Sequence, residues 1–316
     1  MSDFRARVGA VTITAVLSVI ILAPRAWAWD NATHKLITRL AIGALPPSAL
    51  KDTFEAHASL LAEYSVEPDS VLKERYGEAE RRRHYIDLEY YGREPFAALT
   101  PDRAAMDRRF GRAQVDGAGS LPWTIEDMAS KSAEAWRRGD CAAMFRYSGY
   151  LSHYAGDATQ PLHTTIHFDG YRRDRGIHAR LELAVEHQTE RLGRAAAPQV
   201  HATAIDSVWD TSLGEIRGAH ALVNETIRDD RAAREYGRLG GKGYEQALMA
   251  RGESMFARQI AEGASALASI WLMEWRQAGS PALCKRARRA VSEAFPREFR
   301  AARALEYEGA GRIDLN

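Results

Sequence analysis

The chain has 316 residues, 46% of them hydrophobic, and its 43 basic and 42 acidic side chains leave a formal net charge of +1. This near-equal number of positive and negative charges argues against a protein whose main work is to neutralise a nucleic-acid backbone. It does not argue against an enzyme that acts on nucleic acid. The hydrophobic content suffices for one large core or two small ones, and we favour one domain.

The first 28 residues have the pattern of a secretory signal peptide. Arg5 and Arg7 form a positive start, residues 9–23 are almost wholly apolar, and Ala26-Trp27-Ala28 matches the signal-peptidase pattern. A membrane anchor is the less favoured interpretation, because the apolar run is short for a spanning helix of about 20 residues. We therefore predict export, to the periplasm or the medium, and a mature chain that begins at Trp29.

Beyond this segment, apolar residues recur at three- and four-residue intervals, which is the pattern of amphipathic helices. Leu36, Leu40 and Leu45 mark the first helix, and Pro46-Pro47 ends it. A second helix is expected over about residues 48–64. Together they predict a helical start to the mature chain.

Later helices are predicted from caps and loops. Thr124-Ile-Glu-Asp resembles an N-cap with an acidic first turn, which predicts a helix to about residue 138. Further helices are expected at the following places: residues 142–156, from about Ile177 after a Gly- and Arg-rich loop, from about Ala204, and residues 245–277. The longest irregular stretch is expected at about residues 91–123. Strand-like alternation is nearly absent, so the predicted fold is an all-α multi-helix bundle.

The chain has 10 histidines, and four of them fall in one short segment: His153, His163, His167 and His178. In HYAGD, His153 and Asp157 are one helical turn apart, and in HARLE the same spacing separates His178 from Glu182. An imidazole and a carboxylate on one helical face form half of a site for zinc, which takes nitrogen and oxygen ligands.

One such pair alone would be weak support for a metal site, because the same spacing is common in surface ion pairs. Here there are two pairs, and Pro161 ends the first helix so that His163 can return beside it from a turn. The combination favours metal binding.

The segment HYAGDATQPLH followed by GIHARLE resembles the core signature of zinc-dependent phospholipase C and its relatives, the single-strand-specific zinc nucleases. The resemblance spans Trp29 to about Gly279. It implies an exported enzyme whose mature chain begins with Trp and which binds three zinc ions at the end of the core helices of an α-helical fold.

The resemblance also implies nine zinc ligands. Two of the three ions would lie close together. One ion of this pair would be bound by Asp69, His84, His153 and Asp157, and the other by Trp29, His34 and Asp157. The third, more separate ion would be held by His163, His178 and Glu182. Trp29 would contribute its free amine and its carbonyl oxygen.

A water that bridges two zinc ions is acidified toward a pKa of about 7 and becomes a hydroxide nucleophile for a phosphodiester. Asp157 would bridge the two metals, and Asp69 could in addition accept a proton from the attacking water. We therefore predict Asp69 and Asp157 as the catalytic residues. Asp87 is a candidate acceptor that orients a ligand imidazole, and the alternative is a solvent-facing loop aspartate.

Three other groups of residues are expected to play no part in the metal site. Arg81, Arg82 and Arg83 form a solvated run, from which one side chain could reach an anionic substrate. His167 is expected to be a structural loop residue. The remaining histidines lack partners at ligand spacing: His57, His187, His201 and His220.

Three details favour the phospholipase branch, in which the final ligand is typically Glu, as Glu182 is here, rather than Asp. GIHARLE and ASIWLMEWRQAG also resemble phospholipase segments. A nuclease would need aromatic side chains that stack on bases, for which the candidates are Trp123, Tyr90, Tyr91 and Tyr171. A phospholipase would need an apolar rim, for which they are Phe96, Leu99 and Phe168.

The implied domain organisation has a signal peptide at 1–28, a zinc-dependent phosphodiesterase domain at 29–280 and an Arg-rich helical extension at 281–316. The extension is expected to be solvated, with transient contact to a membrane surface as the alternative. The two cysteines, Cys141 and Cys284, either form one disulfide or remain separate thiols.

Phospholipid is the predicted substrate, with single-stranded nucleic acid as the alternative, and we expect a monomer that forms no stable nucleic-acid complex. A third hypothesis is a zinc-stabilised binding protein without turnover. Structural zinc usually has four protein ligands, whereas nine groups shared among three ions leave positions open for water. The count favours an enzyme.

Overall fold

Helices make up nearly all of the regular structure in the computed structural model, which describes residues 31–237 and 241–281. Within these ranges there is no strand, and a single isolated antiparallel bridge joins Ile86 to Gly119. The predicted all-α bundle is therefore confirmed.

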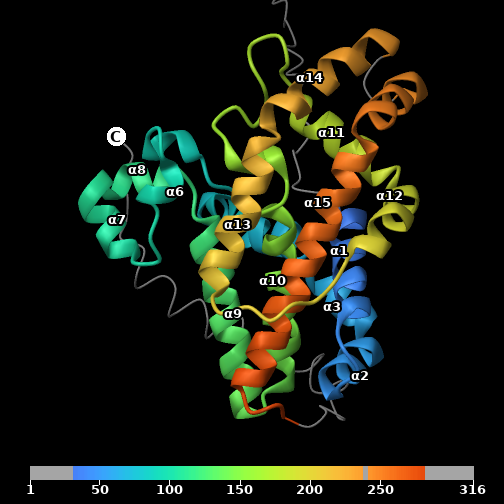
Figure 1. Cartoon of the computed structure of the whole chain (residues 1–316). Helices are drawn as coiled ribbons and strands as arrows, with labels where there is room; N and C mark the ends of the chain where they lie inside the picture. The colour runs from blue at the N-terminus through green and yellow to red at the C-terminus, as the bar shows by residue number, and fades with distance from the viewer. Residues whose placement is uncertain (1–30, 238–240, 282–316) are drawn as a thin grey trace, which may run out of the picture.

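The centre of the bundle is a layer of long helices (Figure 1). The longest is α15 (Lys242–Gln277), which packs against α1 (Asn31–Ala44), α9 (Leu121–Arg138) and α10 (Cys141–Asp157). Its apolar residues, such as Phe256, are fully buried among these neighbours. Because α15 contacts elements from both ends of the chain, it holds the bundle together.

The most enclosed of these helices is α10, in which all residues from Ala142 to Asp157 except Tyr147 are buried. Against it packs α3 (Ala58–Tyr64), and this approach needs Gly149, because a Cβ atom there would lie 2.3 Å from the Cβ atom of Tyr64. Burying a histidine and an aspartate on such a helix lowers the stability of the fold unless other polar groups or a metal bind to their nitrogen and oxygen atoms. The end of α10 is thus the natural place to look for a site.

Medium-length helices cover this layer, and their bounds are α2 (Ala49–Ala56), α11 (Ile177–Glu186), α12 (Thr189–Ala196), α13 (Val208–Ala221) and α14 (Val223–Ala233). Short helices fill the connections: α4 (Lys73–Tyr76), α5 (Glu78–Arg81), α6 (Pro95–Ala98), α7 (Arg103–Phe110) and α8 (Arg112–Gly117). A π-helix, Pro68–Leu72, and two 3-10 turns, Arg82–His84 and Pro161–Thr164, carry side chains of the site described below.

The predictions for the first helix, for 142–156, for the start at Ile177 and for 245–277 agree with α1, α10, α11 and α15 to within a few residues. The predicted helix over 48–64 is instead two helices separated by His57. The helix expected from about Ala204 begins at Val208, where the hydroxyl of Ser207 accepts a hydrogen bond from the backbone amide of Asp210.

Two further expectations were wrong. Thr124 is not an N-cap, because α9 begins at Leu121 with Pro122 in its first turn, where a missing amide hydrogen costs nothing. The stretch 91–123 is not irregular but contains α6, α7, α8 and the start of α9. Its helices are too short for their periodicity to stand out in the sequence.

None of the described helices combines the length and the apolar composition that crossing a bilayer requires. The predicted signal peptide, the Arg-rich extension, Trp29 and Cys284 all lie outside the described residues.

Candidate metal centre

Eight of the nine predicted ligands converge where the last turn of α10 meets α1 and α11, and the ninth, Trp29, lies outside the described residues. The eight come from six different elements: His34, Asp69, His84, His153, Asp157, His163, His178 and Glu182. Seven are buried and His178 is half-buried. Residues 148 positions apart in the sequence are thus brought into one polar cluster inside an apolar bundle.

The first group of ligands surrounds one carboxylate oxygen of Asp157. Its Oδ2 atom lies 3.1 Å from Nδ1 of His84 and 3.3 Å from Nε2 of His153, and these two nitrogens are 2.9 Å apart. Oδ1 of Asp69 is 3.4 Å from the same nitrogen of His84. Four potential ligand atoms therefore share one small space, as the first predicted zinc site requires.

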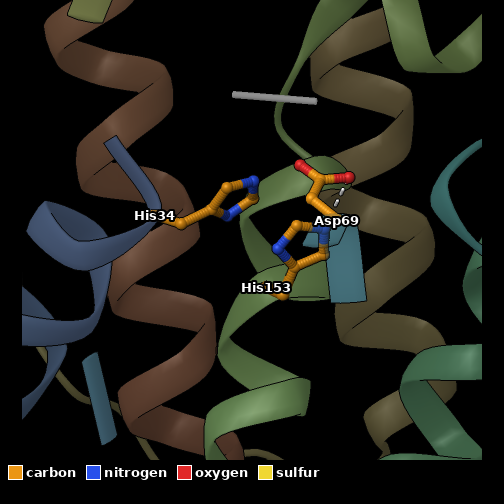
Figure 2. Close-up of side chains that lie close together, drawn as sticks. All are labelled: His34, Asp69 and His153. Carbon is orange, nitrogen blue, oxygen red and sulfur yellow. Dashed lines mark ion pairs between the residues drawn. The ribbon is translucent and has the colours of Figure 1, made fainter. Parts of the chain in front are cut away.

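His34 lies on the other side of His153, with the two rings stacked at a centroid distance of 3.8 Å. Figure 2 shows both imidazoles and the carboxylate of Asp69 directed toward one another from three separate elements. Nε2 of His34 is 3.6 Å from Oδ1 of Asp157, and His34, Asp69 and His153 together form a group that could hold a metal ion. His34 is therefore close to both Asp157 and Asp69.

The third group, His163, His178 and Glu182, comes from the 3-10 turn at Pro161 and from α11. The Nε2 atoms of the two histidines are 3.0 Å apart, and Oε1 of Glu182 lies 2.7 Å from that of His178. Nδ1 of His163 is 3.3 Å from Oδ1 of Asp157, which links this group to the other two. Asp157 therefore lies beside at least one histidine of each group.

Several buried polar atoms of the site have no hydrogen-bond partner among the described residues, which would be costly in a finished core. They include both ring nitrogens of His34, Oδ2 of Asp69, Oδ1 of Asp157, Nδ1 of His163 and Oε2 of Glu182. Histidine nitrogens and carboxylate oxygens are the ligands that zinc prefers outside thiolate sites. The donor set therefore fits zinc, and its unsatisfied atoms are those that metal ions would satisfy.

The histidines and carboxylates also fix one another's charges. Burial opposes ionisation of Asp157, but His153 and His163 hold its pKa well below the usual range. Burial likewise works against His163, but the carboxylates of Asp157 and Glu182 raise its pKa to about 10. For His34, burial and the neighbouring His153 lower the pKa well below 6.5, so its ring is neutral and free to bind a metal.

A second layer of residues orients the ligands, and sequence reasoning missed its main member, Glu80. Its buried Oε1 atom lies 3.4 Å from Nε2 of His84 and accepts a hydrogen bond from the hydroxyl of Tyr154. Burial opposes ionisation of Glu80, but contacts with His84 and Arg83 lower its pKa to about 2. The four-residue spacing of Glu80 and His84 was a usable signal, since the same spacing singled out the ligand pairs.

Other ligands are held in the same way. The backbone carbonyl of Ser65 lies 2.8 Å from Nδ1 of His153, and the side-chain amide of Gln160 donates to Glu182 over 3.0 Å. Asp87 was proposed for such a role but has no contact with a ligand imidazole. It lines the cleft beside the site, where burial and the nearby Glu89 raise its pKa to about 7.

A cleft of about 250 Å³ opens directly onto the ligands and is lined by His84, His163 and His178. Leu162 and Phe168 form the apolar part of its wall, and the charged part holds Lys73 and Arg81 together with Glu78 and Asp87. Lys73 also forms an ion pair with Asp69. The cleft can therefore receive a molecule with both an anionic and an apolar part.

The residues that were candidates for base stacking or for an apolar rim lie in three different places: the cleft, the surface and the core. Phe168 lines the cleft, whereas Phe96 is only partly buried against the core and Leu99 is buried. Trp123 packs on Trp209 and donates to the carbonyl of Thr100, and Tyr91 is buried, so neither faces the metal centre. Tyr90 and Tyr171 are exposed.

The remaining predictions concern basic residues outside the ligand set. Arg83 is not part of a freely solvated run, because it pairs with Glu80 and Asp127. His57, His187 and His220 have ordinary hydrogen-bond partners outside the ligand set, in Thr53, Glu245 and Thr164 respectively, although Thr164 directly follows His163. The ring of His167 packs against that of Tyr171 within its loop, as a structural residue would.

An all-α bundle with buried histidine and carboxylate ligands at the end of its core helices defines a helical metalloprotein. Residues 33–220 match the family model of zinc dependent phospholipase C. This match covers more than half of the chain, which therefore belongs to the zinc dependent phospholipase C family. No curated protein matches the chain in sequence.

Two solved structures that resemble the chain are clostridial toxins. One is the alpha toxin from Clostridium absonum, with 13% identity and a TM-score of 0.42, and the match covers 77% of this chain and 63% of the toxin. The other is the alpha-toxin of Clostridium perfringens from an avian strain, with 13% identity and a TM-score of 0.46, covering 79% of this chain and 65% of the toxin. This chain thus spans just under two thirds of each toxin.

Proposed function

We propose that this protein is an exported, zinc-dependent phosphodiesterase that hydrolyses phospholipids in the manner of a phospholipase C. The observation that carries the proposal is the convergence of three ligand groups around Asp157, beside a cleft whose wall holds apolar side chains and two basic ones, Lys73 and Arg81. Membership of the zinc dependent phospholipase C family supports the same chemistry.

We assign three zinc ions to the site, with Trp29 completing the group of His34 and Asp157. Zinc at these positions would supply a Lewis acid for the phosphate and would lower the pKa of water. The third group has only three protein ligands, His163, His178 and Glu182, and so leaves a coordination position for water or substrate. That open position supports catalysis over a purely structural role for the metal.

The residues of the chain supply the rest of the mechanism. Asp157 holds the ligand histidines together and stays ionised, because His153 and His163 keep its pKa low. Asp69 has one oxygen facing the ligands and a second, Oδ2, without a hydrogen-bond partner among the described residues, so it can accept a proton from the attacking water. Lys73 and Arg81 in the cleft wall would bind the anionic part of the substrate.

A nuclease of the same superfamily is the second candidate, and the exposure of Tyr90 and Tyr171 favours it, because bases stack on such side chains. Two of the four aromatic candidates for stacking, Tyr91 and Trp123, belong to the core instead. Phe168, which was a candidate for an apolar rim, does line the cleft. The balance of these residues supports phospholipid as the substrate.

The test is parallel hydrolysis of phosphatidylcholine and of single-stranded DNA by the processed protein with zinc, each with and without a chelator. Chelator-sensitive release of the phosphorylated head group is expected. Release of nucleotides instead would assign the protein to the nuclease branch. Three bound zinc ions with neither activity would favour a binding protein.

A further inference from the structure

The loop between two ligands of the third group carries an unusual surface. We call residues 166–175 the rim loop; it joins His163 to His178. Five large hydrophobic side chains are exposed among the described residues, and three of them are in this loop: Ile166, Phe168 and Tyr171, at 41%, 50% and 43% exposure. Scattered exposed hydrophobic residues need no explanation, but a cluster on one short loop does.

The same loop is basic. Arg172, Arg173 and Arg175 are all exposed, and none of their guanidinium groups makes an ion pair with a described carboxylate. The loop also holds two acidic residues, and both are engaged within the protein: Asp174 is buried and accepts hydrogen bonds from Arg231 and Arg234, and Asp169 accepts one from the backbone amide of Gly176. The outer face of the rim loop is therefore apolar and positively charged at once.

The rim loop is fixed to the protein at several points. At its start, the carboxylate of Glu89 accepts hydrogen bonds from the hydroxyl of Thr165 and from the backbone amide of Ile166. At its end, Asp169 accepts one from the amide of Gly176. With Asp174 anchored to α14, the exposed side chains are held in place, so a partner would not have to order them on binding.

The rim loop also lies at the mouth of the cleft. The ring of Phe168 is 5.9 Å from that of His178 and lines the cleft, whereas Ile166, Arg172 and Arg173 are outside it. A partner that covers the loop would be directly beside the metal ligands.

We propose that the rim loop docks on the surface of a phospholipid bilayer that contains anionic lipid. Ile166, Phe168 and Tyr171 would enter the interfacial region, and the arginines would pair with lipid phosphates. A bilayer fits better than a nucleic acid because Ile166 has no π-face on which a base could stack. The inference rests on the proposed function and specifies that the protein acts on aggregated lipid at a membrane surface.

The test is sedimentation of the full, zinc-loaded protein with vesicles of phosphatidylcholine alone or mixed with phosphatidylglycerol. Replacing Arg172 and Arg173 by Ser should weaken binding to the mixed vesicles by about fivefold per arginine, and added salt should weaken binding of the unaltered protein. Ile166→Ser should weaken binding to both vesicle types. The matched control replaces Arg137 and Arg138 in the last turn of α9, a helix that runs away from α11 toward the opposite end of the bundle (Figure 1).

Hydrolysis of a dispersed short-chain phosphatidylcholine separates this inference from the proposed function. All rim-loop variants should retain the full rate on the dispersed substrate and lose rate on vesicles. No hydrolysis by the unaltered protein would contradict the proposed function, while vesicle binding would still test the loop. The docking proposal would be overturned if the rim-loop variants bound vesicles as well as the unaltered protein does. It would also be overturned if these variants lost only the binding of single-stranded DNA.

Discussion

Glu80 and His84 form a buried contact in which Oε1 of the glutamate lies 3.4 Å from Nε2 of the imidazole. The opposite nitrogen of the same ring, Nδ1, lies 3.1 Å from Asp157 in the ligand cluster. A carboxylate behind a ligand histidine fixes which nitrogen carries the proton and makes the other a better metal ligand. Glu80 thus acts on the metal centre without belonging to it.

Glu80→Gln should therefore weaken zinc binding by roughly 10- to 100-fold, because the amide cannot stabilise the imidazole as a carboxylate does. The measurement is competition for zinc against a chelator, followed together with the circular dichroism of the fold. Glu74→Gln is the control, since Glu74 is exposed on the neighbouring α4. Equal zinc affinity in the two variants would remove Glu80 from the site.

The shared position of Asp157 leads to a second prediction. Asp157→Asn should remove at least two zinc ions, because its two oxygens face His34, His84, His153 and His163. Glu182→Gln should remove only the third ion, because the only predicted ligands that its carboxylate contacts are His163 and His178 of that group. Metal analysis of the purified variants gives the stoichiometry, and loss of the same number of ions from both would contradict the assignment.

A third prediction compares two histidines. His153→Ala should abolish activity, because this fully buried ring contributes to the close pair of ions. His201→Ala should leave activity unchanged, since His201 is exposed and its ring nitrogen contacts only a backbone carbonyl two residues away. The rate of phosphodiester hydrolysis in saturating zinc is the readout. Comparable losses in both variants would mean that the rates report general damage to the protein.

Four of the nine predicted ligands occur in pairs at a spacing that a helix turns into proximity. His153 and Asp157 are one turn apart on α10, so their partnership is local. The joining of Asp69 and His34 to the same cluster depends on how α1 and the π-helix pack on α10, which spacing alone does not encode. That part came from the family resemblance.

The features that could not be predicted from the sequence depend on tertiary packing. The short helices between residues 91 and 123 have too few turns to show a periodic apolar face, so their sequence predicts irregular chain. The exposure of the rim loop likewise depends on the anchoring of Asp174 by α14, far away in the sequence. Neither follows from local pattern.

The contact between α3 and α10 gives a fourth prediction. In Gly149→Ala, the added Cβ would meet the Cβ atom of Tyr64 at 2.3 Å, so the two helices must move apart. We expect a loss of about 1 to 3 kcal/mol in the free energy of unfolding. Zinc affinity should fall as well, because Ser65, next to Tyr64, holds His153 through its carbonyl.

Gly214→Ala is the matched control, since nothing lies within 4 Å of a Cβ atom at this position in α13. It should raise the free energy of unfolding by about 1 kcal/mol, the difference in helix propensity between the two residues. Urea unfolding of both variants measures the effect. A stable Gly149→Ala variant would show that the helices can separate at little cost.

The last prediction concerns Glu215 on α13, which faces a second cleft together with Glu262, away from the metal ligands. Burial and the nearby Glu262 raise the pKa of Glu215 from 4.5 to about 7. A carboxyl group whose pKa is higher in the folded state binds protons more tightly there, so the protein loses stability as the pH rises from 4.5 to 7. Above that range the loss is constant, at roughly 1 to 3 kcal/mol.

Glu215→Gln removes this titration and should therefore make the protein more stable than the unaltered chain at about pH 8 but not at about pH 4. The difference in melting temperature between the two proteins, followed across this range, isolates the effect from zinc loss, which both share at low pH. Glu235→Gln, at an exposed position, controls for the removal of one negative charge. If the difference in melting temperature were the same at every pH, the carboxyl group of Glu215 would not be titrating in this range in the folded protein. Repulsion from Glu262 would then have no measurable effect on the pKa of Glu215.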